Sequence, residues 1–144
     1  MSSIIEMAGW ARERAGRTVV AVTASHHWFE GRRNDSGPVH IWLHFDDGRV
    51  TALHGMGDHL WAFPEDVGVP VDLGEHGEIR VAAAEPPDPL ARLVGARLRE
   101  VRAVPDRFDP DRCTGIHLAW AGGTLYLGSE ADEWIVQPLS PVYE

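Results

Sequence analysis

Four residues combine the side-chain types and the placement that acid–base chemistry needs: Asp58, His59, Asp132 and Glu133. Asp58 and Asp132 each lie six residues before a proline, within two segments of similar sequence. Two carboxylates that share a site push their pKa values apart, which lets one donate a proton while the other accepts one. An Asp just before a strand also commonly hydrogen-bonds the turn backbone, and this structural role is the leading alternative.

Metal-ligating side chains come closest together in the segment that holds His54, Asp58 and His59. These three are the best metal candidates in the chain, but their spacing matches no zinc pattern such as His-Glu-x-x-His. His40 and His44 would lie about 13 Å apart on a strand, which is too far for one shared ion. We therefore predict no metal and no other cofactor.

Aromatic and histidine side chains supply a second kind of candidate, a binding surface made of Trp28, Phe29, His40, Trp42 and His44. Apolar residues alternate with the last three, which predicts a strand that turns His40, Trp42 and His44 toward one face. Trp28 and Phe29 are expected in an irregular loop. Exposed aromatic residues are typical of recognition surfaces. The alternative is that a helix covers this sheet face.

Composition narrows the class of partner. The chain has 144 residues and a formal net charge of −9, from 13 basic and 22 acidic residues. An acidic surface repels phosphate backbones, which disfavours nucleic acid as a partner. A more basic protein partner is electrostatically compatible, although acidity also serves solubility alone. A chain near this length buries about two-thirds of its unfolded surface, so we expect residues 1–144 to form a single domain.

The cellular compartment can be predicted from the cysteine count and from hydropathy. Cys113 is the only cysteine, so the chain forms no internal disulfide and fits a reducing compartment. Its acidic neighbours Asp109 and Asp111 oppose activation of the thiol as a nucleophile. No apolar run approaches the ~20 residues that a spanning helix needs, and no signal-peptide pattern is present. We expect a cytoplasmic protein without a membrane partner.

The sequence indicates two diverged copies of one unit, which align in three blocks. Residues 40–50 align with 115–125, 58–64 with 132–138, and 16–22 with 95–101, at offsets of 75, 74 and 79 residues. Three matches in the same order indicate duplication, with repeats at approximately 3–64 and 88–138 connected by 65–87. Each copy alone would be marginally stable, so we expect both to fuse about a pseudo-twofold into one core.

The sequence pattern of each copy predicts a helix, a strand, a β-hairpin and a short strand, in that order. Capping residues start the helices at Ser3 and Asp88, and a glycine ends each of them. Alternating apolar residues beside Asp47-Gly48 and Gly122-Gly123 indicate the hairpins. The other expected elements are strands at 17–24, 59–63, 78–84, 97–104 and 133–137, with irregular loops at 25–38 and 105–114. The expected fold class is α+β, mostly β.

The repeated unit, as in Gly115 to Trp120 followed by Asp132-Glu133-Trp134, resembles a pattern in small, acidic, uncharacterised bacterial proteins. Some of these proteins are similar in size and acidity to the immunity proteins of toxin systems. The resemblance implies a protein-binding role, often against a basic toxin domain, and it transfers no catalytic residue.

Three functional hypotheses follow. The first is a non-catalytic protein-interaction module, immunity-like or a regulatory partner of a more basic protein. The second is a small-molecule-binding protein or a small enzyme, with an Asp/His site between the two copies, because clefts at such interfaces suit ligands. The third is a homodimer whose sheet faces pair.

Overall fold

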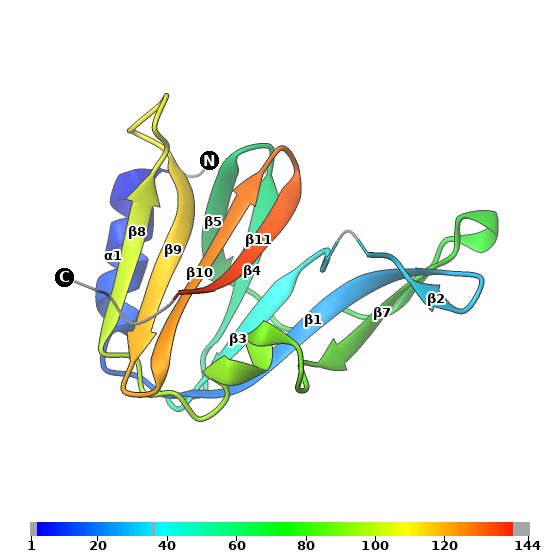
Figure 1. The fold of residues 1–144 in the computed structure, drawn as a ribbon, viewed down its shortest axis with the longest axis horizontal. Coiled ribbons are helices and arrows are strands. Elements are labelled where there is room, and N and C mark those ends of the chain that lie inside the picture. Colours follow the sequence, from blue (N-terminus) through cyan, green and yellow to red (C-terminus); the bar gives the residue numbers. More distant parts are fainter. Residues whose placement is uncertain (1–2, 36, 140–144) are drawn as a thin grey trace.

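The computed structural model describes residues 3–35 and 37–139, which form one α-helix, two short 3-10 helices and two antiparallel sheets (Figure 1). The elements in chain order are α1 (Ile4–Arg14), β1 (Val19–Phe29), β2 (Arg32–Arg33), β3 (Ile41–Phe45), β4 (Val50–Met56), β5 (His59–Pro64), β6 (Val71–Asp72), η1 (Gly74–His76), β7 (Glu78–Ala83), η2 (Pro89–Leu93), β8 (Glu100–Pro105), β9 (Cys113–Trp120), β10 (Gly123–Glu130) and β11 (Glu133–Leu139). The fold is therefore α+β and mostly β. None of the helices in the described ranges has the length and apolar character needed to cross a membrane.

Helix α1 begins where its capping residue predicts. The Ser3 hydroxyl accepts hydrogen bonds from the backbone N–H groups of Ile5 and Glu6, at 3.2 and 3.4 Å. Those N–H groups have no partner within a helix, so the side chain stabilises the first turn. Met7 and Ala11 lie on its buried face.

The prediction of an α-helix after Asp88 is wrong, although the prediction that Asp88 is a capping residue is confirmed. The Asp88 carboxylate accepts the Leu90 N–H at 3.0 Å, but the element that follows is the 3-10 helix η2. Its five residues end before Gly95, which has a φ of 84° and turns the chain away. The segment is too short for a stable α-helix.

The two sheets differ in extent. The first has seven strands in the order β5-β4-β3-β1-β7-β6, with β2 paired to β1, and the second has four in the order β11-β10-β9-β8. The predicted hairpins are both present, as β3–β4 and β9–β10, and the extra strand expected near 78–84 is β7. At the first hairpin turn Gly48 has a φ of 82°, which a glycine adopts without strain.

The hydrophobic core lies between the two sheets and α1. Ile41, Leu43 and Phe45 of β3 are almost fully buried there, together with Ile116 and Leu118 of β9. Burial of a side chain of this size contributes about 1.5–3 kcal/mol. Both halves of the chain therefore contribute to one continuous cluster.

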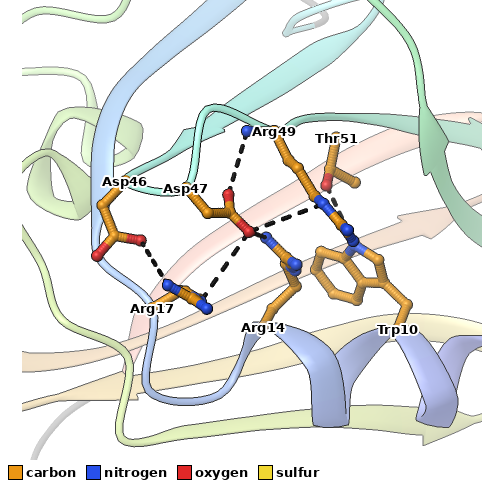
Figure 2. A network of polar contacts seen from close by, with 7 residues as sticks. All are labelled: Trp10, Arg14, Arg17, Asp46, Asp47, Arg49 and Thr51. Atoms are coloured by element: carbon orange, nitrogen blue, oxygen red, sulfur yellow. Dashed lines mark hydrogen bonds and ion pairs between the residues drawn. The ribbon is translucent and has the colours of Figure 1, made fainter.

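Arg14 connects the end of α1 to the turn between β3 and β4 (Figure 2). Its guanidinium lies 3.0 Å from the Asp47 carboxylate and 4.9 Å from the centre of the Phe45 ring. Partial burial acts to raise the pKa of Asp47, but the Arg49 N–H and the Arg14 guanidinium outweigh it and lower that pKa. Nearby, Trp10 Nε1 donates to the Thr51 hydroxyl at 3.2 Å.

The outer part of β1 extends past the second sheet as an arm, defined here as residues 25–33 and 71–83 (Figure 1). The prediction of an irregular loop at 25–38 is wrong for the first part of that range. Residues 23–28 of β1 pair with β7, and Trp28 and Phe29 also pair with β2. The pairing partner is about fifty residues away in the sequence, so no local pattern could predict how far β1 extends.

Candidate functional site

A groove of about 1280 Å³ lies beneath the arm, on the side that faces β11. Its floor consists of Ala24, His26 and Trp28 from β1, with Arg80 and Ala82 from β7. Ala24 pairs with Ala82 and His26 with Arg80, and residues directly opposite each other on paired strands share one face of the sheet. We call this feature the arm groove.

The opposite wall of the arm groove comes from β11 and from the segment that leads into η2. Trp134 and Val136 of β11 present apolar surface to it. Trp134 Nε1 donates to the Val39 carbonyl at 3.2 Å, which ties this wall to the segment before β3. The wall and the floor therefore belong to different sheets.

Carboxylates outnumber guanidinium groups on the lining of the arm groove. They are Asp35, Glu85, Asp88 and Glu133, against Arg33 and Arg80. Arg80 is already engaged, because its Nε donates to Glu78 at 2.6 Å and its guanidinium lies 4.2 Å from the centre of the Trp28 ring. The groove thus combines an aromatic floor with an acidic rim.

His26 adds a neutral polar group to the floor. Burial lowers its pKa, the nearby Arg33 charge lowers it further, and Asp88 opposes both effects. A neutral imidazole offers one hydrogen-bond donor and one acceptor, which suits a peptide backbone as well as a polar side chain.

No protein-family model, curated protein or solved structure matches this chain. Of the residues predicted from sequence, the arm groove brings together Trp28 and Glu133. Phe29, the neighbour of Trp28, is 46% exposed and does not line the groove. Arg80 and Asp88 were missed as site residues, because Arg80 was expected only as part of a strand and Asp88 only as a helix cap.

Asp58 and Asp132 lie close together, but each carboxylate is held by the other's turn. Asp58 Oδ1 accepts the Ala131 N–H at 2.8 Å, and Asp132 Oδ1 accepts the Gly57 N–H. The Asp132 N–H in turn donates to the Gly57 carbonyl at 2.9 Å. These contacts favour the structural alternative for both residues over paired acid–base chemistry.

Replacing either aspartate should destabilise the fold. We expect Asp58→Ala to lower the free energy of unfolding by about 1 kcal/mol, because it leaves a turn N–H without its acceptor. Asp132→Ala should cost more, because Asp132 also has a φ of 66°, which alanine adopts less readily than aspartate. Urea denaturation measures the change. Asp132→Asn keeps an acceptor oxygen and should cost less. Unchanged stability in both alanine variants would contradict the structural role.

His59 and His54 have separate partners, so the three metal candidates do not converge. His59 Nε2 lies 3.2 Å from Asp106, and His54 Nε2 lies 3.7 Å from Glu65. Asp106 also accepts the Phe108 and Asp109 N–H groups at 2.8 and 3.2 Å. The Phe108 N–H, against some burial, lowers the pKa of Asp106, and the Asp109 N–H and His59 add to this effect. Within residues 3–35 and 37–139, no group of three His, Cys, Asp or Glu could hold a metal.

In the expected exposed strip of His40, Trp42 and His44, Trp42 is covered and is not a surface residue, and the two histidines are half-buried. Trp42 is only 3% exposed. The covering element is the segment between β5 and β6 and not a helix, since a Cβ added at Gly68 would lie 3.2 Å from the Trp42 ring. His44 Nε2 is hydrogen-bonded to the Thr23 hydroxyl at 2.8 Å.

His40 and His54 stack beneath the same segment, with ring centres 4.1 Å apart. Burial lowers the pKa of each, and the charge of His40 lowers that of His54 further, while Glu65 opposes the shift in both. In the unfolded chain both take the ordinary value of 6.5. At a pH between the lowered folded-state pKa and the unfolded-state pKa, the unfolded state therefore binds more protons than the folded state.

Folding stability should fall as the pH is lowered from 7.5 to 5.5. The contribution of this histidine pair is complete above pH 6.5 and is lost as the pH falls through the lower folded-state pKa. Urea denaturation at several pH values measures the slope. His54→Gln should make the slope shallower, whereas His76→Gln, at a side chain 79% exposed, should not. Equal slopes in all three proteins would refute the assignment.

Proposed function

We propose that this protein is a non-catalytic interaction module that binds an extended, basic segment of a partner protein in the arm groove. The observation that carries the proposal is the pairing of two tryptophans, Trp28 on the floor and Trp134 on the opposite wall, with a rim on which carboxylates predominate. Aromatic side chains with desolvated surroundings provide most of the energy at protein interfaces. The formal net charge of −9 adds long-range attraction for a basic partner.

The shape of the groove suits a segment better than a folded surface. The floor is a length of two-stranded sheet, and the walls rise from β11 and from residues 85–90. Lysine or arginine side chains of the segment would meet Glu85, Asp88 and Glu133, while apolar side chains would pack on the tryptophans. An immunity-like role against a basic toxin domain, or a regulatory role, is the biological setting that we propose for this binding.

Selection of peptides tests the proposal without a known partner. Random twelve-residue peptides displayed on phage are selected on the intact protein, and the enriched sequences are synthesised and titrated by calorimetry. We expect basic peptides that bind Glu133→Arg about tenfold more weakly or worse, a loss of about 1.4 kcal/mol. Glu100→Arg makes the same change of charge on β8 (Figure 1), at a residue that does not line the groove, and should bind like the unmodified protein.

Either of two results would count against the proposal. Enriched peptides without basic residues would remove the acidic rim from recognition. Equal weakening by Glu133→Arg and Glu100→Arg would mean that net charge alone attracts the peptides, independently of the groove.

We also propose that the two halves of the chain descend from one duplicated unit that is fused about a pseudo-twofold. The strand orders β5-β4-β3-β1 and β11-β10-β9-β8 correspond, element by element, to the sequence alignment. Thr18 and Arg97, which the alignment matches, face each other in an isolated bridge. The reciprocal contacts of Asp58 and Asp132 have the same symmetry. Loss of stability in both aspartate variants would support the reciprocal contacts on which this symmetry rests, and an effect in only one of them would oppose it.

A cytoplasmic location is part of the same proposal. Cys113, the single cysteine of the sequence, is a buried thiol whose pKa is raised by burial, and its Sγ donates to the Gly115 carbonyl at 3.1 Å. A buried thiol of this kind is a structural residue that suits a reducing compartment. Fractionation of the host cell measures the location directly, and recovery outside the cytoplasm would contradict it.

A further inference from the structure

The outer edge of β7 is only partly paired. Along one side, residues 78–83 pair with β1 over their whole length. Along the other side, β6 pairs only with Glu78 and Ile79. Residues 80–83 therefore present an open edge, and open edges are templates for pairing with another chain.

The direction of each backbone group on this edge follows from one hydrogen bond. The Ala84 N–H donates to the Val22 carbonyl at 2.9 Å, so Ala84 faces β1. In an antiparallel ladder alternate residues face the same neighbour, so the N–H and C=O groups of Val81 and Ala83 face outward. Within the described ranges of the chain, these groups have no backbone partner.

The open edge borders the arm groove. Val81 and Ala83 belong to the groove lining, as do Arg80 and Ala82 from the floor. Ala82 and Ala83 are exposed, and their small side chains leave room for a neighbouring backbone. A strand added here would lie about 4.8 Å from β7, with alternate side chains directed beneath the arm.

We infer that the basic segment of the partner binds as an added β-strand on the outer edge of β7, hydrogen-bonded to Val81 and Ala83. This inference rests on the proposed function and specifies how the groove is occupied. Backbone hydrogen bonds supply affinity, and alternate side chains supply specificity. Charge complementarity selects the occupant, because side chains at every second position approach Asp88 and Glu133. The segment therefore carries Lys or Arg at alternate positions.

One variant removes a hydrogen-bond donor from the open edge of β7 and leaves the charged residues of the groove unchanged. Ala83→Pro deletes an outward N–H and leaves the inward hydrogen bonds of β7 in place, a substitution that edge strands tolerate. Ala83→Thr keeps the N–H and is the matched control. The selected basic peptides should bind Ala83→Pro about tenfold more weakly or worse, and Ala83→Thr nearly as well as the unmodified protein. Circular dichroism and thermal unfolding check that both variants are folded.

Hydrogen exchange provides a second measurement that needs no variant. Bound peptide should slow exchange at the Val81 and Ala83 amides, which face outward. The amides of Ala82 and Ala84, already bonded to β1, should change little. Unchanged exchange at both outward amides during saturating peptide binding would refute strand addition even if Ala83→Pro failed to fold.

The outcomes separate this inference from the function on which it rests. If Glu133→Arg weakens peptide binding and Ala83→Pro does not, strand addition is overturned and binding in the groove remains supported. If neither variant weakens peptide binding, both strand addition and binding in the groove are overturned. Sedimentation of the protein alone gives the remaining outcome, because a dimer that Ala83→Pro dissociates would assign the edge to a second copy and overturn the inference.

Discussion

Trp42→Ala is expected to lower the free energy of unfolding by about 3–5 kcal/mol, the cost of truncating a large core side chain. The ring is covered by the segment at Gly68 and flanked by His40, whose ring centre is 5.8 Å away. Truncation would leave a cavity between that segment and β3. Urea denaturation of the variant and of the unmodified protein measures the difference.

Two further variants distinguish a core role of Trp42 from a role in peptide binding. Trp42→Phe keeps most of the ring and removes Nε1, a buried donor that has no hydrogen-bond partner among residues 3–35 and 37–139, so it should cost much less. Trp28→Ala should weaken peptide binding with little effect on stability, because Trp28 lines the arm groove. A stable Trp42→Ala that had lost peptide binding would return Trp42 to the binding surface and contradict its assignment to the core.

Arg14→Ala is expected to lower the free energy of unfolding by about 3 kcal/mol. The Arg14 side chain is only 5% exposed, and it connects α1 to the β3–β4 turn through Asp47 (Figure 2). Its removal takes away the guanidinium that lies over the Phe45 ring and is the closest cation to the Asp47 carboxylate. Thermal and urea unfolding measure the effect.

Arg17 is the matched control, because it contacts the same turn from the surface. Its guanidinium lies 3.9 Å from Asp46 and 4.0 Å from Asp47, and its side chain is 49% exposed. Exposed ion pairs contribute about 0–1 kcal/mol, so Arg17→Ala should change stability little. Arg14→Met should cost less than Arg14→Ala, because it keeps the buried volume. Equal effects of Arg14→Ala and Arg17→Ala would mean that burial of Arg14 adds nothing.

The residues that act locally could be predicted from the sequence. Ser3 starts α1, Asp88 caps η2 and Gly48 closes the β3–β4 turn, because each acts on a backbone only a few residues away. Period two also assigned Ile41 and Leu43 to the buried face of β3. The roles of the polar candidates were harder to predict, since a carboxylate such as Asp58 has the same sequence signature whether it supports a turn or transfers a proton.

The surface and the site depend on contacts between distant segments. Trp42 alternates correctly with the core residues, yet the segment at Gly68 buries its face as well, and periodicity cannot show which faces a later segment covers. Trp28 lies in a strand because β7 pairs with it. Glu133 lines the same groove as Trp28 because β11 lies opposite the arm. The sequence alone determined the two hairpins, the caps, the turns and the acidity, whose causes are local or additive. Only the tertiary structure decided which side chains face solvent together, because that depends on long-range pairing and packing.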